Sequence, residues 1–254
     1  MIHVGTSGYN YPEWRGRFYP ADLPATRMLP FYAERFGSVE INATFYRMPT
    51  EKVVAAWAQT TPAAFVFTLK APQRITHMKR LIDVDDPLRR FTDVAATLGT
   101  KLGPLFFQLP PNFKKEAGRL AQLLAMLPPG RRAAFEFRHA SWFADDVYDL
   151  LRTRDAALCV ADTDAGTTPD VATASWGYLR LRDAGYSDAE LDRWATRIQR
   201  PEWRDAFVYF KHEDEAKGPE LAQRMLTRVG GRMPLAPAPG APAAPSVAAR
   251  LSER

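Results

Sequence analysis

Two carboxylates, Glu40 and Glu136, stand between apolar residues in short segments that read Val-Glu-Ile-Asn (39–42) and Phe-Glu-Phe-Arg (135–138). Because the side chains of a strand alternate between its two faces, the apolar residues point to one side and the carboxylates to the other. Two carboxylates can serve as general acid and general base. We therefore take Glu40 and Glu136 as candidate catalytic residues, set further apart than two carboxylates that share a proton.

The same alternation places cations beside these carboxylates. Lys70 ends the segment Phe-Thr-Leu-Lys (67–70), and Arg180 and Arg182 alternate with leucines. The cations outnumber the carboxylates, and arginine binds phosphate or carboxylate groups through paired hydrogen bonds. We therefore predict that the site binds a small anionic metabolite that is phosphorylated, carboxylated or sugar-like. The candidate substrate-binding residues are Lys70, Arg138, Arg180, Asn42, Gln108, Tyr46 and Trp142.

Two histidines follow predicted strands and could transfer protons. His77 and His139 are therefore candidate catalytic residues. A mononuclear metal site built from Glu40, Glu136, Asp162 and His139 is an alternative. The chain has no HxH, HExxH or cysteine cluster, so we assign no metal ligand and leave the cofactor open.

Other residues at the same end of the predicted strands have two interpretations. A desolvated Lys70 beside cations could form a Schiff base, although phosphate binding is the favoured role. Tyr46 and Trp142 could stack on a ring or sugar face, or could simply wall the loops. Arg182, Lys211 and His212 are left unassigned, and a loop or capping role suits His212 at least as well.

The elements that must position these residues alternate along the chain. Apolar segments predict eight strands, at 2–5, 38–42, 65–70, 105–109, 133–138, 158–162, 176–182 and 206–212. Helical patterns separate them, at 27–36, 51–59, 87–98, 114–127, 145–154, 188–199 and 215–229. This alternation predicts an α/β fold, a TIM-like (β/α)8 barrel. The polar stretch 163–175 has no helical period, so we expect an irregular sixth crossover.

The polar residues fall in the last half of their segments, at the end of a barrel where active sites lie. The alternative is a set of internal ion pairs, such as Glu136 with Arg180, that only fill the barrel. A doubly wound sheet fits less well, because Gly-Thr-Ser-Gly-Tyr (5–9) lacks the GxGxxG pattern of a phosphate-binding turn.

Composition limits the remaining possibilities. The 254 residues divide into a barrel domain at 1–229 and a Pro/Ala-rich segment at 230–254, which we expect to be a disordered tail. The net charge is +5, but no run of five basic residues occurs, so a nucleic-acid partner is not expected. No segment predicts a membrane span or a secretory signal, so we expect a cytoplasmic protein. A non-catalytic binding or nucleic-acid accessory protein that uses the positive rim remains the alternative function, and the oligomeric state is open.

Several segments resemble the YecE-like proteins, also called domain of unknown function 72. The matching stretches, in order, are GTSGY (5–9), WRGRFYP (14–20), VEINATFY (39–46), KAP (70–72), ITH (75–77), LGPLFFQLPP (102–111) and FEFRHASW (135–142). The resemblance runs from Ile2 to about Leu226 and implies a TIM-like barrel and a bacterial-type cytoplasmic protein, but no settled activity. The chain departs from the commoner pattern at Arg182, where histidine and glycine often follow the arginine, and at Lys211-His212, where paired asparagines are frequent.

Overall fold

The computed structural model describes residues 1–163, 166–183, 185–211 and 214–230. The segment expected to be a disordered tail lies outside these residues, apart from Gly230, and so does His212. The division into two regions therefore stays a prediction.

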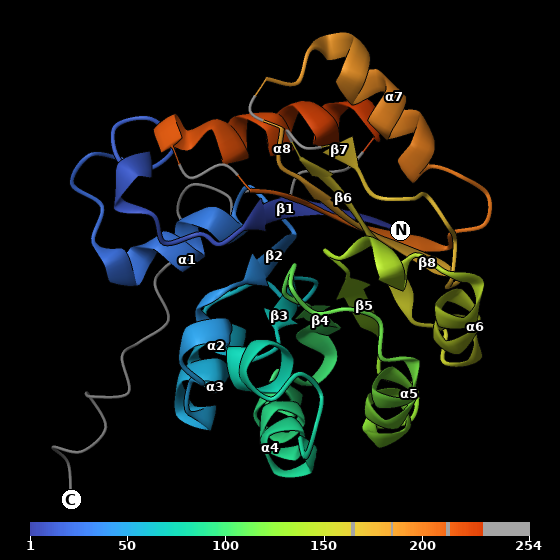
Figure 1. Ribbon diagram of the computed structural model, residues 1–254. Helices are drawn as coiled ribbons and strands as arrows, with labels where there is room; N and C mark the ends of the chain where they lie inside the picture. Colours follow the sequence, from blue (N-terminus) through green and yellow to red (C-terminus); the bar gives the residue numbers. More distant parts are fainter. Residues whose placement is uncertain (164–165, 184, 212–213, 231–254) are drawn as a thin grey trace, which may run out of the picture.

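Eight parallel strands of the described residues close into a barrel, as predicted (Figure 1). The strands are β1 Ile2–Ser7, β2 Ser38–Ile41, β3 Val66–Lys70, β4 Leu102–Gln108, β5 Ala133–Glu136, β6 Ala157–Thr163, β8 Trp176–Leu181 and β9 Asp205–Phe210. Neighbours in the chain are neighbours in the sheet, β1 pairs with β9, and pairing of β5 with β6 completes the ring. Each predicted strand is present, with ends that differ by up to three residues.

Helices surround the strands and connect them (Figure 1). The main helices are α1 Ala25–Ala33, α3 Glu51–Gln59, α4 Asp85–Ala96, α5 Ala117–Met126, α6 Asp145–Thr153, α7 Asp188–Ile198 and α8 Lys217–Arg228. A single turn, α2 Ala43–Tyr46, and a π-helical turn at Arg74–Met78 lie on loops at the carboxyl ends of β2 and β3. Ser187 begins α7 with a capping box completed by Glu190, so both residues bind otherwise unpaired backbone N–H groups.

The sixth crossover is irregular, as predicted. Between β6 and β8 the described residues form no helix, and β7, the two residues Gly166–Thr167, pairs antiparallel with the end of β6. Thr173 then accepts a hydrogen bond from the backbone N–H of Leu158 and donates one to the carbonyl of Ala156. These bonds hold the crossover against the start of β6 in place of a packed helix.

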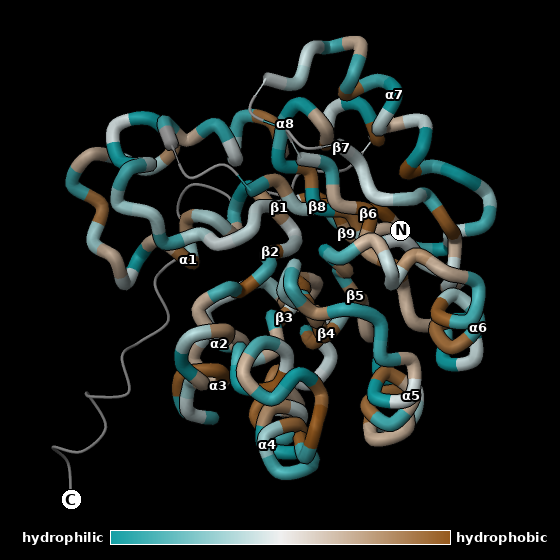
Figure 2. The backbone as a smooth tube through the Cα atoms, in the orientation of Figure 1, coloured by the Kyte–Doolittle hydropathy of each residue, from teal (hydrophilic) through white to brown (hydrophobic). Residues whose placement is uncertain are grey.

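The barrel is filled by side chains below its polar end. Figure 2 shows hydrophobic residues concentrated in the central strands. Every second residue of a strand points inward, and the inward apolar residues form a cluster of their own. This inner cluster contains Phe106, Ala134, Ala157, Cys159, Ala161, Trp176, Tyr178, Phe207 and Tyr209. These side chains form the floor beneath the polar end.

Among the described residues, the structure contains no helix whose length and hydropathy would suit a membrane crossing. The cytoplasmic location stays a prediction.

The contact between β1 and β2 leaves no space at Gly5. A Cβ atom added there would lie 2.0 Å from the carbonyl oxygen of Ser38 and 2.8 Å from the hydroxyl of Tyr32. Because the nearest atom belongs to the backbone of a central strand, it cannot move without disturbing the register of Gly5 with Ser38.

We therefore expect Gly5→Ala to lower the free energy of unfolding by about 3 kcal/mol, the upper end of the usual cost of overpacking. Gly37→Ala is the control, because nothing lies within 4 Å of a Cβ added at Gly37. It should change stability by no more than about 0.5 kcal/mol. Urea unfolding measures both, and equal values for the two variants would contradict the close packing of β1 on β2.

Candidate functional site

A buried guanidinium, that of Arg180 on β8, lies between the two predicted carboxylates. Arg180 is 1% exposed. One of its terminal nitrogens donates a hydrogen bond to Glu136 Oε2 over 2.6 Å, and the other donates to Glu40 Oε1 over 3.0 Å. The guanidinium carbon also lies 4.7 Å from the centre of the Phe106 ring, which forms part of the floor. Glu40 and Glu136 therefore bind one shared cation, and the internal ion pair considered from the sequence is present.

Hydrogen bonds extend from Glu136 across three strands. Glu136 Oε1 accepts bonds of 2.8 Å from Gln108 Nε2 and from Arg138 Nε. Gln108 Oε1 in turn accepts a bond of 2.8 Å from Lys70 Nζ on β3. The expected convergence of these polar residues on one end of the barrel is confirmed.

Ser7 completes the network around Glu40. Its hydroxyl donates to Glu40 Oε1 and accepts bonds from Asn42 Nδ2 over 2.7 Å and from Arg180 over 3.1 Å. The Tyr178 hydroxyl donates to Glu40 Oε2 over 2.5 Å. Neither Ser7 nor Tyr178 was a predicted site residue. The alternation could have found Tyr178, two positions before Arg180, but Ser7 was missed because the predicted first strand ended at Gly5.

The cations determine the charge state of Glu136. Burial raises the pKa of its carboxyl, but the neighbouring Arg180 and Arg138 together lower it by more than burial raises it. The resulting pKa is about 2. Glu136 is therefore a carboxylate at neutral pH, and each of its oxygens accepts a hydrogen bond from a cation. This environment suits a residue that positions arginines better than one that donates a proton.

Lys70 lies in a different environment. Its side chain is 8% exposed, and its Nζ lies 4.0 Å from the centre of the Phe45 ring. Burial and the nearby Arg180 lower the pKa of the amine to about 7, against the partly compensating Glu40 and Glu136. A large fraction of Lys70 is therefore neutral near pH 7 and has a lone pair available for chemistry.

A cavity of about 390 Å³ opens beside Lys70 at the carboxyl ends of β1, β2 and β3. Its walls combine aromatic rings, backbone and a few polar groups. They are formed by Gly8, Tyr9, Asn10, Tyr11, Ile41, Asn42, Ala43, Tyr46, Trp57, Lys70 and Lys211. Three predicted binding residues, Asn42, Lys70 and Tyr46, therefore share one hollow. Asn42 Oδ1 is buried and has no hydrogen-bond partner among the described residues.

Two further arginines lie near this network. Arg138 keeps a third of its side chain exposed while its Nε binds Glu136. Arg182 is half-buried, and its side chain makes no hydrogen bond or ion pair within the described part of the chain. Burial, together with Arg180 and Arg138, lowers the pKa of Arg182. Arg182 therefore adds a positive charge at the mouth that no carboxylate of the described residues pairs.

The two predicted histidines lie outside the walls of the cavity. His77 Nδ1 is 2.9 Å from the Thr76 hydroxyl, and its ring meets the Phe45 ring edge to face at 4.9 Å. Burial and the neighbouring cations, first Lys70, lower the pKa of His77 to about 4, so it is neutral at pH 7. His139 Nδ1 lies 2.9 Å from the Ser141 hydroxyl and accepts the backbone N–H of Ser141. This second histidine caps a short helical turn.

Trp142 lies in the barrel wall, where it has no exposed surface. Its indole N–H donates to the carbonyl of Phe113 over 2.7 Å, and its ring stacks on Phe137 with a centroid separation of 4.8 Å. The structure does not bring this predicted binding residue to the cavity, because the loop after β5 folds Trp142 back between the helices.

The four residues considered for a metal do not come together. Glu40 and Glu136 bind Arg180, whereas Asp162 accepts hydrogen bonds from Thr167 and Tyr186. No group of three or more His, Cys, Asp or Glu side chains in the described ranges has a metal-binding arrangement.

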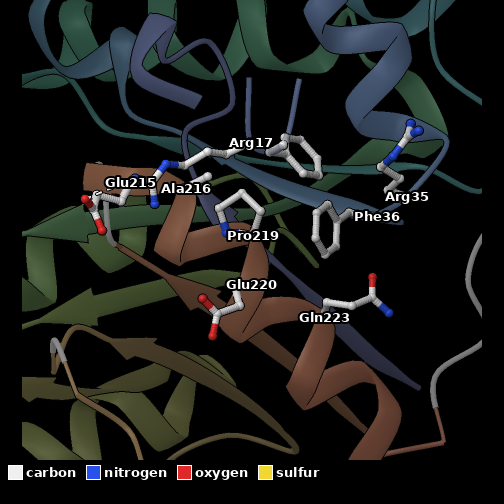
Figure 3. A pocket seen from close by; sticks show the side chains of 9 residues that line it. Arg17, Arg35, Phe36, Glu215, Ala216, Pro219, Glu220 and Gln223 are labelled. Atoms are coloured by element: carbon white, nitrogen blue, oxygen red, sulfur yellow. Dashed lines mark hydrogen bonds and ion pairs between the residues drawn. The ribbon is translucent and has the colours of Figure 1, made fainter. Parts of the chain in front are cut away.

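A larger hollow, of about 570 Å³, lies outside the barrel between α1 and the start of α8 (Figure 3). The sticks show Phe36 and Pro219 facing each other across it, with Arg17 and Glu215 at one side. Arg17 and Glu215 form an exposed ion pair of 3.1 Å. The predicted site residues do not line this hollow, so size alone does not mark the site.

The buried pair of Glu136 and Arg180 gives a direct test of this geometry. We expect Glu136→Gln to lower the free energy of unfolding at pH 7 by about 3 kcal/mol, because it removes one of the two carboxylates that bind the buried Arg180 and the carboxylate that binds Arg138. The folded pKa of Glu136 is depressed, so its stabilisation is present above pH 4.5 and is lost as the pH falls towards 2. The wild type should therefore lose more stability than the variant between pH 5 and pH 3 in urea unfolding.

The control is Asp86→Asn, which removes a surface ion pair with Arg89 in which both side chains are largely exposed. It should cost no more than about 0.5 kcal/mol. A Glu136→Gln protein as stable as the wild type at pH 7 would contradict the assigned ion pairs.

Known proteins are similar to this chain in sequence and in fold. The family model described as "Protein of unknown function DUF72" matches residues 3–245. The UPF0759 protein YunF of Bacillus subtilis (strain 168) is 29% identical to this chain, and the match covers 89% of this chain and 94% of that protein. A DUF72 family protein from Thermotoga maritima has a similar crystal structure, with a TM-score of 0.76, 24% identity, and coverage of 91% of this chain and 99% of the other. A second, from Enterococcus faecalis V583, has a TM-score of 0.74 at 17% identity, covering 91% and 96%. The chain belongs to the DUF72 family, as the YecE-like segments of its sequence predicted.

Proposed function

We propose that this DUF72 protein is an enzyme that acts on a small anionic metabolite in the cavity at the barrel mouth. The observation that carries the proposal is the lining of that cavity. A buried amine, Lys70, and a buried amide oxygen of Asn42 without a described partner both belong to a hollow large enough for a small metabolite. A site that served only packing would leave neither group beside open space.

The charges around the cavity support an anionic ligand. Lys70 and Lys211 line it, and Arg138 and Arg182 lie nearby with Glu136 already paired. A phosphate or carboxylate would supply a negative charge for Arg182, which makes no ion pair among the described residues. Phosphorylated, carboxylated and sugar-like acids are the chemical classes that fit.

The roles within this proposal follow from environment. Glu40 and Glu136 hold Arg180 and orient the cations, so they act as positioning groups more than as the acid and base first considered. Lys70, whose pKa is about 7, is better suited to move protons near pH 7. His77 and His139 stay outside the cavity walls, where His77 packs against Phe45 and His139 caps the turn that contains Ser141.

A thermal-shift screen tests the proposal. The ligands are inorganic phosphate, phosphorylated sugars and small carboxylic acids. We expect at least one anion to raise the melting temperature of the wild type by about 5 °C at a hundredfold excess over Kd, the shift for about 2.7 kcal/mol of linked stability. Arg182→Gln should reduce that shift because it removes a cation that has no described partner of its own.

Lys52→Gln is the matched control, because it also removes one cation but from the exposed face of α3. It should keep the full shift. If no anion stabilises the wild type, or if Arg182→Gln responds as fully as Lys52→Gln, the anionic-metabolite proposal is wrong. Salt-dependent stabilisation by polynucleotides alone would favour the nucleic-acid accessory alternative.

A further inference from the structure

Lys70 has no carboxylate as a direct partner, although two carboxylates lie within the same network. Its Nζ donates to the amide oxygen of Gln108, and it forms no ion pair within 4 Å among the described residues. Gln108 stands between Lys70 and Glu136 and turns its amide nitrogen to the carboxylate. A structural lysine at this position would gain most from pairing with Glu136 itself, so the intervening amide needs another explanation.

The amide contact suits a neutral amine. A neutral Nζ can donate one N–H to Gln108 Oε1 and still direct its lone pair elsewhere. The Phe45 ring, 4.0 Å from Nζ, limits the directions that remain, and the cavity lies beside the amine. The lone pair is therefore available to an electrophile that binds in the cavity.

The environment of Lys70 leaves a large fraction of its amine neutral near pH 7. Burial and Arg180 lower its pKa to about 7, and Glu40 and Glu136 are too strongly engaged by arginine to restore the usual value. The charged and titratable groups around Lys70 are Glu40 on β2, His77 on the loop after β3, Glu136 and Arg138 at the end of β5, Arg180 on β8 and Lys211 after β9.

We infer that Lys70 is a nucleophile that forms an imine with a small anionic aldehyde or ketone bound in the cavity. This inference rests on the proposed function and adds the carbonyl group to the substrate class. The rings of Tyr9 and Trp57 line the same cavity and would limit the access of water to the bond, while Lys211 would meet the anionic group.

The step balances without an oxidant or a cofactor. The Lys70 lone pair attacks the carbonyl carbon and forms a C–N bond, and one N–H proton moves to the carbonyl oxygen to give a carbinolamine. The hydroxyl group then leaves with the second N–H proton as water, and a C=N bond forms. The products are the imine and one water molecule, with no change in oxidation state. When protonated by solvent, the imine withdraws electrons from the adjacent carbon.

Reductive trapping tests this inference on the full chain. The protein is mixed with glyoxylate, a small anionic aldehyde, at pH 7, reduced with cyanoborohydride, digested and mapped by mass spectrometry. We expect the adduct on Lys70 to exceed that on the exposed Lys52 by about a thousandfold, because about half of Lys70 is neutral at pH 7 while only a few ten-thousandths of an ordinary lysine is. Labelling of Lys70 should increase from pH 6 to pH 8.

Two comparisons make the outcomes distinct. Lys70→Met should lose the site-specific adduct, and the mapping of the wild type gives the same answer if that variant fails to fold. Anion-induced stabilisation without a Lys70 adduct would overturn the inference and leave the proposed function intact. Propionaldehyde is a neutral aldehyde. If it forms the Lys70 adduct as readily as glyoxylate does, and if excess phosphate does not suppress that adduct, the anionic substrate class and the proposed function are both wrong.

Discussion

The guanidinium of Arg180 is the group around which the polar end of the barrel is organised. A charge with 1% exposure is costly unless it is paired and hydrogen-bonded, and Arg180 meets this requirement with Glu40 on one side and Glu136 on the other. Ser7 adds a third acceptor. Since these partners come from β1, β2 and β5, the ion pairs hold distant parts of the barrel together. Replacing Glu40 or Glu136 would remove one of the two charge partners of the buried Arg180, and replacing Ser7 would remove a hydrogen-bond acceptor.

This arrangement also determines the chemistry available at the mouth. Both buried carboxylates bind arginine. Among the described residues, Lys70 on β3 therefore donates its hydrogen bond to the amide oxygen of Gln108. Burial and the nearby Arg180 lower the pKa of its amine to about 7, and the amine borders an open cavity. The ion pairs inside the barrel therefore coexist with a cavity at its mouth.

The layer below supplies the rigidity that such a network requires. Phe106 supports the Arg180 guanidinium from beneath, and Tyr178 joins that layer to Glu40 through its hydroxyl. Tyr209 hydrogen-bonds to Ser38 and Thr68 across the barrel axis. The tyrosine hydroxyls thus fix the floor to the polar residues above it and to the neighbouring strands.

Period-two and helical patterns are local properties of the chain, so the strands, the helices and the face that each polar residue occupies could be predicted from the sequence. The convergence of Glu40, Lys70, Gln108, Glu136 and Arg180 on one end of the barrel follows from these patterns. Which of these residues touch could not be predicted, because contacts across a barrel depend on how the ring closes and how the strands are staggered. Closure of the barrel places both carboxylates beside Arg180, brings Ser7 into the network and leaves a cavity beside Lys70. The position of Trp142 could not be predicted for the same reason. The loop after β5 folds so that its ring lies in the barrel wall and not in the cavity.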